Sequence, residues 1–344
     1  MVTARQDFTE FTALAAERAR IADDLVRHLR ETLGGAPSSL AQAGEYVLSV
    51  TGKLLRPMLM LEACRAAGGD PELVLPAALG TEYGHVASLV HDDIIDGDAE
   101  RRGQATLHVK YNVGAAILTG DLLIFNTFLN FAECEDRGAS AERVLAAIRT
   151  LSATCIEMCR GQALEAEIAG DLDITEETYL KMIRLKTASF CRAAARIGAS
   201  LGGADDAAVD ALARYGDQLG TAFQIVDDML PYVSDGHTLG KSRHSDLLNH
   251  RVTLPIIYAI QDGGAGVRAQ LQALFAAAPA DAGEEALAHR QVRRLLLSTR
   301  ALHRARALAY RYTEGAKQAL DQLPASPSRE RLRGLADAFL ARDR

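Results

Sequence analysis

The chain has 344 residues, of which 48% are hydrophobic, and its formal net charge is −7. This length suits one large or two smaller domains, and the acidic balance, without a basic groove interleaved with aromatic residues, argues against nucleic-acid binding. The charged segment from Met1 to Ala22 argues against a signal peptide or anchor, and no apolar run is judged long enough to cross a bilayer. We therefore expect a cytoplasmic protein without a transmembrane segment.

Helical spacing of apolar residues dominates the chain, and runs of β-branched residues are rare, so we expect an all-α fold. Asp70 is predicted to cap a helix whose first position is Pro71. Thr175 is predicted to start another helix, because the two glutamates after it favour the positive end of a helix dipole. Breaks or looser links are expected at 34–37, 68–69, 202–203, 263–266 and 277–283.

The first acidic motif is His91-Asp92-Asp93-Ile94-Ile95-Asp96, and Arg101-Arg102-Gly103 follows it. On a helix, Asp92 and Asp96 lie one turn apart on the same face. Carboxylates suit Mg²⁺, which also binds substrate phosphates and water, and arginine forks match phosphate oxygens. The segment therefore indicates a metal-assisted phosphate site, although a solvated acidic turn beside a basic pair is the alternative.

A second acidic pair, Asp227-Asp228, ends another apolar helical run, residues 222–226. Apolar residues before both acidic motifs suggest that each helix is largely buried, and a buried carboxylate needs a partner such as a metal cluster. Two such helices facing each other would hold cations between them. The second pair therefore favours a functional interpretation over a solvated turn.

Several cations and one histidine are candidates for anion binding. Lys53 and Arg56 share one helical face, and His85 shares the face of Asp92 two turns earlier. A solvated edge and a satisfied core histidine are the respective alternatives. Lys186 and Lys241 are further cations without an obvious acidic partner nearby in sequence.

The five cysteines are Cys64, Cys134, Cys155, Cys159 and Cys191, and they include no CxxC pattern. Cys155 and Cys159 lie one helical turn apart and resemble half of a metal site. Because there is no second thiol pair or suitably spaced histidine pair, we expect them to pack in the core.

The chain resembles the trans-polyprenyl diphosphate synthases in an ordered set of motifs from about Gly52 to Pro255. These are Gly-Lys-x-x-Arg-Pro at 52–57, His-x-Ala-Ser-Leu-Val-His-Asp-Asp-x-x-Asp at 85–96, Arg-Arg-Gly at 101–103, Gly-Asp at 120–121, Gly-Gln at 161–162, Lys-Thr at 186–187, Phe-Gln-x-x-Asp-Asp at 223–228, Gly-Lys at 240–241 and Thr-Leu-Pro at 253–255. The resemblance implies an antiparallel helix bundle around a deep central cavity, of the isoprenoid synthase type, and a homodimer. It also implies a single domain over residues 1–344, with an N-terminal helical segment at 1–40 and looser C-terminal helices at 262–344.

The reaction implied by the resemblance is the head-to-tail condensation of isopentenyl diphosphate with an allylic diphosphate, assisted by a cluster of three Mg²⁺ ions. The implied metal ligands are Asp92, Asp96 and Asp227, supported by Asp93 and Asp228. The implied allylic diphosphate site comprises Arg101, Lys186 and Lys241, with Thr187 and Gln224 facing the developing cation. The implied isopentenyl diphosphate site comprises Lys53, Arg56, His85 and Arg102.

Three positions depart from the family pattern. Pro231 stands where a third aspartate usually closes the second acidic motif, and proline removes a backbone donor. Asp235 is too far along to replace that carboxylate, so we expect Asp227 to carry most of the metal binding and activity to survive. Arg251 stands where a lysine is common, and Leu54 stands where a basic residue is common.

Small side chains before Asp92 predict a long product. Ala87, Gly84 and Thr81 lie five, eight and eleven residues before it, so no aromatic floor closes the cavity there. The motif also lacks the two-residue insertion of many short-chain bacterial relatives. We expect a product longer than geranylgeranyl diphosphate, in a cavity lined by Thr81, Gly84, Ala87 and Ser88 with a deeper floor from Ile124, Phe125 or Phe128.

Three other functions compete with chain elongation. A class I terpene cyclase shares the ionisation chemistry but needs no isopentenyl diphosphate site, so Lys53, Arg56 and Arg102 argue against it. A regulatory subunit of a heteromeric prenyl synthase is suggested by Pro231, although such subunits typically lose the first acidic motif. A metal phosphohydrolase would leave the second acidic pair unexplained.

Overall fold

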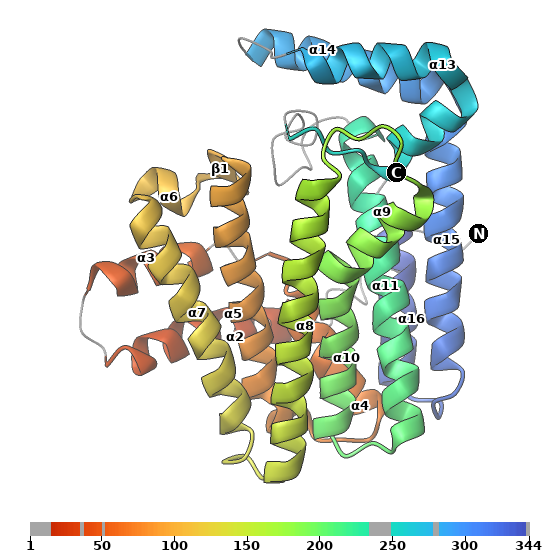
Figure 1. Ribbon diagram of the computed structural model, residues 1–344. Helices are drawn as coiled ribbons and strands as arrows, with labels where there is room; N and C mark the ends of the chain where they lie inside the picture. The colour runs from red at the N-terminus through yellow and green to blue at the C-terminus, as the bar shows by residue number, and fades with distance from the viewer. Residues whose placement is uncertain (1–14, 35–37, 50–51, 234–248, 278–281, 342–344) are drawn as a thin grey trace. The chain divides into compact units, whose positions relative to one another are not determined.

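The computed structural model describes residues 15–34, 38–49, 52–233, 249–277 and 282–341. Apart from one ladder of two short strands, the regular structure in these ranges is helical, which confirms the all-α prediction (Figure 1). The chain divides into two compact units, described separately below. Unit 1 comprises Met1–Ala153, Cys191–Gly216 and Gln318–Leu335, and unit 2 comprises Thr154–Phe190, Asp217–Lys317 and Ala336–Arg344. The single-domain organisation stays a prediction.

The helices and strands follow one another with short connections. From the N-terminal side they are α2 (Ala15–Thr32), α3 (Ser39–Ser49), α4 (Leu55–Ala66), α5 (Pro71–Asp96), β1 (Glu100–Arg101), β2 (Gln104–Ala105), α6 (Leu107–Lys110) and α7 (Val113–Glu133). They continue as α8 (Ala141–Glu167), α9 (Glu176–Ile183), the π-helix η1 (Arg184–Ala188), α10 (Ser189–Leu201), α11 (Asp206–Val233), α13 (Leu254–Ala276), α14 (Ala282–Ser298), α15 (Ala301–Leu320) and α16 (Pro327–Leu340).

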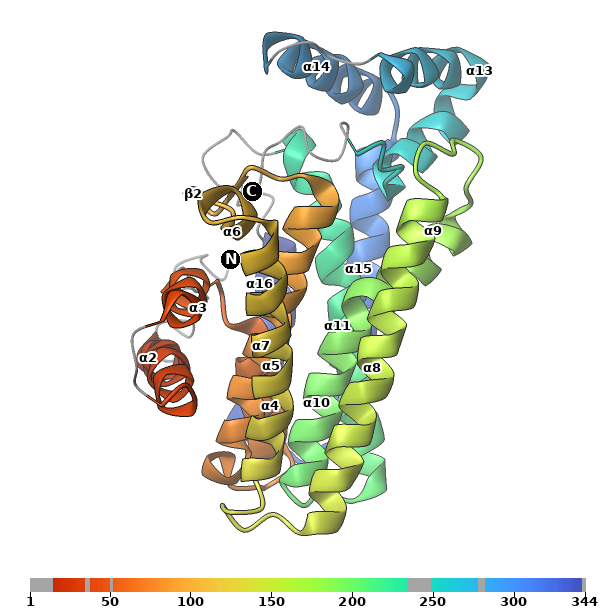
Figure 2. The same cartoon turned by 60° about the vertical axis from the view of Figure 1, so that its left-hand side comes forward.

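Helix α5 is the central element of unit 1, where it packs against α4 and lies beside α7 (Figures 1 and 2). The predicted start is confirmed, because the Asp70 side chain accepts a hydrogen bond from the Glu72 amide at 3.0 Å and Pro71 follows it. Gly80 allows α7 to approach closely, since a Cβ there would lie 3.0 Å from the Phe131 ring. The helix ends at Gly97, whose φ of 67° suits glycine.

The two strands form a hairpin that the sequence did not predict. Glu100 pairs with Ala105 and Arg101 with Gln104 in an antiparallel register. The turn residues Arg102 and Gly103 both have positive φ, 53° and 77°, as a type I′ hairpin turn requires. An arginine in this conformation is strained, which makes the turn a candidate functional feature.

In unit 2, the predicted start of α9 is also confirmed, because Thr175 Oγ1 accepts a hydrogen bond from the Thr178 amide at 3.1 Å. The helix then runs without a break into η1 and α10. Helix α13 kinks at Gly264, whose φ of 61° and ψ of −151° are open mainly to glycine. The glycine-rich link expected at 263–266 is therefore a kink within one helical element.

Helix α7 corrects the expectation that no apolar segment is long enough to cross a membrane. By length and composition alone α7 qualifies, and 44% of its apolar window is buried. Buried Asn126 and Asn130 donate to carbonyl groups one turn earlier, which fits a core-facing side. Another side is exposed and apolar, with Ile117, Leu118, Phe125 and Leu129 between 45% and 71% exposed.

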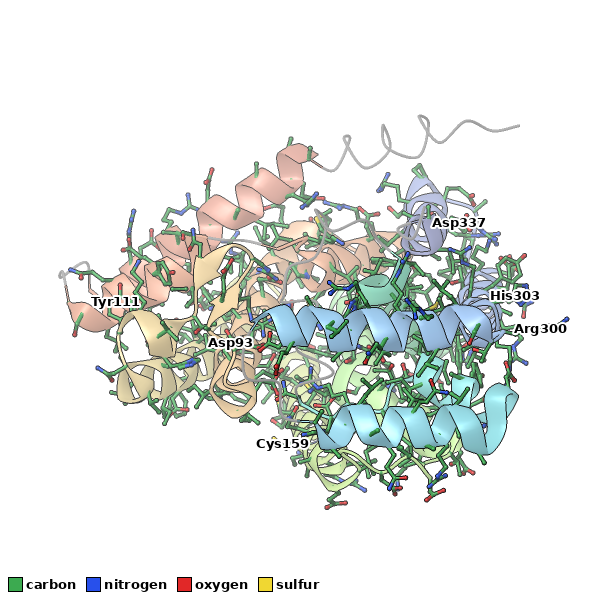
Figure 3. All side chains as sticks on the ribbon, turned by 90° about the horizontal axis from the view of Figure 1, so that it is seen from above. Asp93, Tyr111, Cys159, Arg300, His303 and Asp337 are labelled. Carbon is green, nitrogen blue, oxygen red and sulfur yellow. The ribbon has the colours of Figure 1, made fainter. Side chains whose placement is uncertain are left out.

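All five cysteines are free thiols. Cys64, Cys134 and Cys191 are buried, and burial raises the pKa of Cys64 to about 12. Cys155 is half-buried and Cys159, labelled in Figure 3, is exposed, so the prediction of core packing is wrong for Cys159. Helical spacing alone did not reveal which side of α8 is covered.

Candidate functional site

The three aspartates of the first acidic motif have different surroundings at the end of α5. Asp92 and Asp96 lie one turn apart and are partly exposed, whereas Asp93 is only 5% exposed (Figure 3). Asp93 accepts a hydrogen bond from Arg101 Nε at 2.6 Å, and Arg101 Nη2 also lies 3.6 Å from Asp98. This pairing fixes the hairpin to the end of α5 and leaves Asp92 and Asp96 as the more accessible carboxylates.

His91 connects the first acidic motif to the Gly-Asp motif on α7. Its Nε2 atom lies 3.8 Å from Asp121 Oδ1. A Cβ at Gly120 would collide with the His91 ring, so only glycine fits at that position without a shift of the histidine. Gly120 therefore has a steric role that the sequence did not reveal.

The four predicted isopentenyl diphosphate ligands all belong to unit 1. Lys53 and Arg56 flank the start of α4, where Leu54 has a left-handed φ of 52°. The Arg102 guanidinium packs directly on Gly52, since a Cβ at Gly52 would collide with it. The glycine of the Gly-Lys-x-x-Arg-Pro motif thus accommodates the arginine of the hairpin turn.

The electrostatics of this region are those of a partly dehydrated cationic site. Burial, together with Arg56 and Arg102, lowers the pKa of His85 well below its usual value, so His85 is neutral at pH 7. Burial also lowers the pKa of Arg102 from its usual value. A neutral imidazole still donates one hydrogen bond, and guanidinium groups bind phosphate oxygens in pairs. The arrangement can bind a diphosphate.

Glu82 is a residue of this region that the sequence analysis missed. It lies one turn before His85 on α5 and is 2% exposed. Burial raises the pKa of Glu82 to about 7, while Arg56 and Arg102 act in the opposite direction. The signal in the sequence is an isolated acid within the otherwise uncharged run of residues 73–84.

The second acidic motif contains a hydrogen-bonded network within unit 2. Asp228, 8% exposed, accepts hydrogen bonds from the Tyr179 hydroxyl and from Gln224 Nε2, each at 2.7 Å. Thr187 Oγ1 donates to Gln224 Oε1 at 2.9 Å. The network orients the Gln224 amide and fixes Asp228, while the neighbouring Asp227 is partly exposed.

Lys186 has an acidic partner that its sequence neighbourhood did not reveal. Its Nζ donates to Glu165 Oε2 on α8 at 2.6 Å, and Arg251 Nη2 lies 3.4 Å from the same oxygen. A Cβ at Gly161 would collide with the Lys186 backbone, so this glycine lets α8 and η1 approach closely. Lys241 lies outside the described residues.

Helix α11 continues through Pro231 to Val233. Proline lacks the amide that would bond to the carbonyl of Asp227 in a regular helix, but the departure comes within the last turn, where few such bonds remain. The substitution therefore changes a carboxylate into an apolar ring without ending the helix at the motif. Asp235 lies outside the described residues.

The predicted cavity residues on α5 fall into two groups. Thr81 and Ala87 are fully buried, at 0% exposure, whereas Gly84 and Ser88 are partly exposed on the side that leads to Asp92. Of the three floor candidates on α7, Phe125 is 71% exposed and Ile124 and Phe128 are half-buried. Their roles in setting chain length stay predictions.

Carboxylate oxygens suit a hard divalent cation, and Asp92, Asp96 and Asp227 offer partly accessible ones. Within the described ranges, no three histidine, cysteine or acidic side chains converge closely enough to form a metal site on their own. The residues present therefore fit Mg²⁺ bound jointly with phosphate oxygens better than a metal enclosed by protein ligands.

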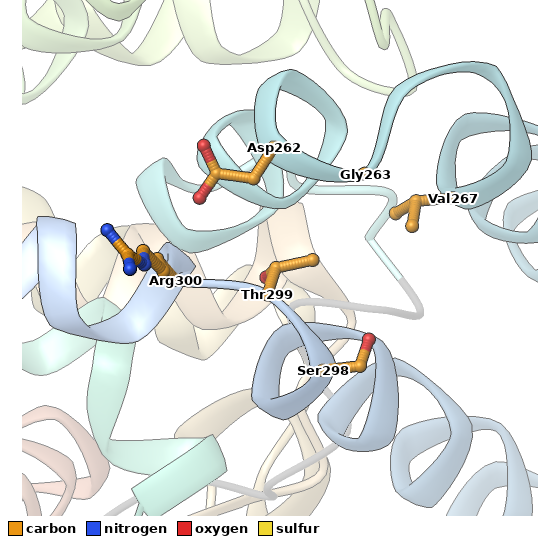
Figure 4. A pocket seen from close by; sticks show the side chains of 6 residues that line it. All are labelled: Asp262, Gly263, Val267, Ser298, Thr299 and Arg300. Atoms are coloured by element: carbon orange, nitrogen blue, oxygen red, sulfur yellow. The ribbon is translucent and has the colours of Figure 1, made fainter.

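Unit 2 also contains a hollow of about 540 Å³ beside the kink of α13 (Figure 4). Asp262 at its edge is paired with Arg304 at 2.6 Å. The hollow contains no residue of the predicted site. Its lining comprises Asp262, Gly263, Val267, Ser298, Thr299 and Arg300.

Comparison with known proteins gives consistent matches over nearly the whole chain. Residues 37–291 match the family model described as polyprenyl synthetase. A geranylgeranyl diphosphate synthase of Methanosarcina mazei is 37% identical over 89% of this chain and 91% of its own length. The octaprenyl diphosphate synthase of Escherichia coli is 33% identical, covering 91% and 93%. A polyprenyl synthase of Caulobacter crescentus, solved with calcium and isoprenyl diphosphate, is 30% identical with a TM-score of 0.86, covering 98% of each chain.

Proposed function

The chain belongs to the polyprenyl synthetase family and is a prenyl diphosphate synthase, and from that premise we propose a specific reaction. It condenses isopentenyl diphosphate head to tail with an allylic diphosphate, and its trans-polyprenyl product is longer than geranylgeranyl diphosphate. The observation that carries the proposal is the cationic, partly dehydrated region of Arg56, Arg102 and neutral His85 in unit 1. A cyclase, which binds one allylic diphosphate, has no use for this second anion site.

We propose three Mg²⁺ ions, held by Asp92, Asp96 and Asp227. Asp93 and Asp228 support these ligands indirectly, because Arg101 holds the first and Tyr179 and Gln224 hold the second. Bound Mg²⁺ would neutralise negative charge on the departing diphosphate. The calcium in the Caulobacter crescentus enzyme supports a divalent cation in this family.

The residues of unit 2 act on the allylic substrate in this proposal. Lys186 is pre-oriented by Glu165 and donates to the leaving diphosphate, together with Lys241 and Arg101. Thr187 and Gln224 are oriented by their mutual hydrogen bond, so their dipoles can stabilise a developing allylic cation. Lys53, Arg56, His85 and Arg102 in unit 1 hold isopentenyl diphosphate.

The proposed product length follows from the side of α5 that leads to Asp92. Gly84 and Ser88 are small and partly exposed there, so a hydrocarbon tail can run along them. Relatives named for geranylgeranyl and octaprenyl products are about equally similar to this chain, so similarity does not decide the length. The full exposure of Phe125 suits a contact with another chain better than a cavity floor.

We also propose a homodimer formed through the exposed apolar side of α7. Ile117, Leu118, Phe125 and Leu129 share that side, and exposed apolar patches of this kind are typical of subunit interfaces. In sedimentation equilibrium, Phe125→Glu should shift the protein toward monomer. The matched control is Tyr310→Glu, which replaces an exposed aromatic residue on α15 and should leave the dimer unchanged. A monomeric wild-type protein would refute the proposal.

A cytoplasmic location is proposed on the basis of the five free thiols, because a reducing compartment keeps cysteines unpaired. Accessible Cys159 should react with a maleimide in intact cells only after the reagent crosses the inner membrane. Labelling by an impermeant maleimide in intact cells would contradict this location.

The reaction is tested with purified protein, labelled isopentenyl diphosphate, Mg²⁺ and dimethylallyl, geranyl or farnesyl diphosphate, with chromatography of the dephosphorylated products. A ladder ending in a linear prenol longer than twenty carbons is expected. Absence of incorporation with every primer would shift weight to a partner-dependent subunit and make Pro231 the leading cause. A cyclic hydrocarbon formed from an allylic diphosphate alone would identify a cyclase.

A further inference from the structure

We propose that Glu82 is a positioning residue for isopentenyl diphosphate, which orients the Arg56 and Arg102 guanidinium groups before the diphosphate binds. This inference rests on the proposed function of the region and deepens it. Glu82 does not touch the substrate in this account. It acts through the two arginines, so its effect should be specific to one of the two substrates.

The placement of Glu82 follows from three segments of unit 1. Helix α5 presents Glu82 one turn before His85, and α4, which packs on α5, starts with Arg56. The hairpin turn supplies Arg102, whose guanidinium is seated on Gly52. The charges of Arg56 and Arg102 both act on the ionisation of Glu82, and Glu82 in turn raises the pKa of Arg102 against the effect of burial.

The charge balance gives Glu82 a function in this region. Two guanidinium groups brought together away from water repel each other, and a carboxylate offsets that repulsion. Because His85 is neutral, one ionised Glu82 still leaves the region with a net positive charge. The arginines can therefore be held in place without losing their attraction for a diphosphate.

A second buried carboxylate in unit 1 shows what an ordinary structural acid looks like. Glu62 is 3% exposed, and its oxygens accept hydrogen bonds from Arg65 at 2.7 Å and Arg331 at 2.9 Å. Glu82 is equally buried, but its Oε2 accepts no hydrogen bond from any described residue. A buried acceptor left unsatisfied costs free energy and persists where function requires it.

The test compares Glu82→Gln with Glu62→Gln in steady-state kinetics. Glutamine keeps the shape of Glu82 and removes its charge, so the variant should fold, which thermal melting checks. With farnesyl diphosphate saturating, we expect the KM for isopentenyl diphosphate to rise about tenfold in Glu82→Gln. The KM for farnesyl diphosphate should change less than about twofold. Glu82→Asp, which restores the charge, should recover part of the loss.

Isothermal titration with isopentenyl diphosphate alone, in Mg²⁺ and without an allylic primer, supplies a measurement independent of turnover. Affinity should fall in Glu82→Gln and remain near the wild-type value in Glu62→Gln. Equal changes in both variants, or equal changes in both KM values, would overturn the positioning role. A wild-type enzyme that incorporates no isopentenyl diphosphate would instead refute the proposed function, so the two failures are distinguishable.

Discussion

Replacing Glu82 with glutamine should change how the stability of the protein depends on pH. The carboxyl pKa is about 7 in the folded protein, against an ordinary value of 4.5. The folded state therefore binds the proton more tightly than the unfolded state. Its stabilising contribution is complete below about pH 4.5 and is lost as the pH rises through about 7.

The size of this effect follows from the two pKa values. One pKa unit corresponds to about 1.4 kcal/mol, so a rise from 4.5 to about 7 corresponds to about 3 kcal/mol. Arg56, Arg102 and His85 surround Glu82, and the lowered pKa of His85 acts in the opposite direction, because its stability contribution is lost as the pH falls. The difference between wild type and Glu82→Gln removes that shared contribution.

Urea unfolding between pH 5 and pH 8 provides the assay. Glu82→Gln should gain stability relative to wild type as the pH rises, by as much as about 3 kcal/mol across this range. Glu62→Gln breaks hydrogen bonds to Arg65 and Arg331, and it should be less stable than wild type throughout. Parallel stability curves for wild type and Glu82→Gln over pH 5–8 would refute the reasoning.

Three further substitutions test other parts of the structure. Ser88→Phe places a ring on the partly exposed side of α5 and should shorten the longest product seen by chromatography; an unchanged distribution would contradict a tail running there. Tyr179→Phe removes one of two side-chain hydrogen bonds to Asp228 and should cost about 1–3 kcal/mol in urea unfolding, so an unaltered midpoint would argue against the network. Gly161→Ala forces a methyl group against the Lys186 backbone and should cost about 1–3 kcal/mol; wild-type stability and activity would show that α8 can move away.

Features that depend on neighbouring residues were predictable from the sequence. The starts at Asp70 and Thr175 follow from capping chemistry within a few residues, and both are confirmed. The all-α class follows from apolar spacing repeated along the whole chain. The ordered motifs led to the correct family, because each of them fixes residue types at short range.

Features that depend on distant parts of the chain were not predictable. Lys186 and Glu165 are 21 residues apart, and Tyr179 and Asp228 are 49 apart, so no local pattern connects them. The side of α7 that carries Phe125 is apolar in sequence whether or not another element covers it. Periodicity identifies an apolar side but not what packs against it.

The π-helical turn at Arg184–Ala188 has a consequence for comparing this chain with its relatives. A π turn accommodates one extra residue inside a continuous helix, so a length difference here would not lengthen or shorten a loop. Deleting one residue would restore α-helical winding and rotate the preceding side chains by about 100° relative to those that follow. A one-residue gap aligned to this segment would thus mark a relative whose Lys186 equivalent faces away from Glu165, even where the sequence motif itself is intact.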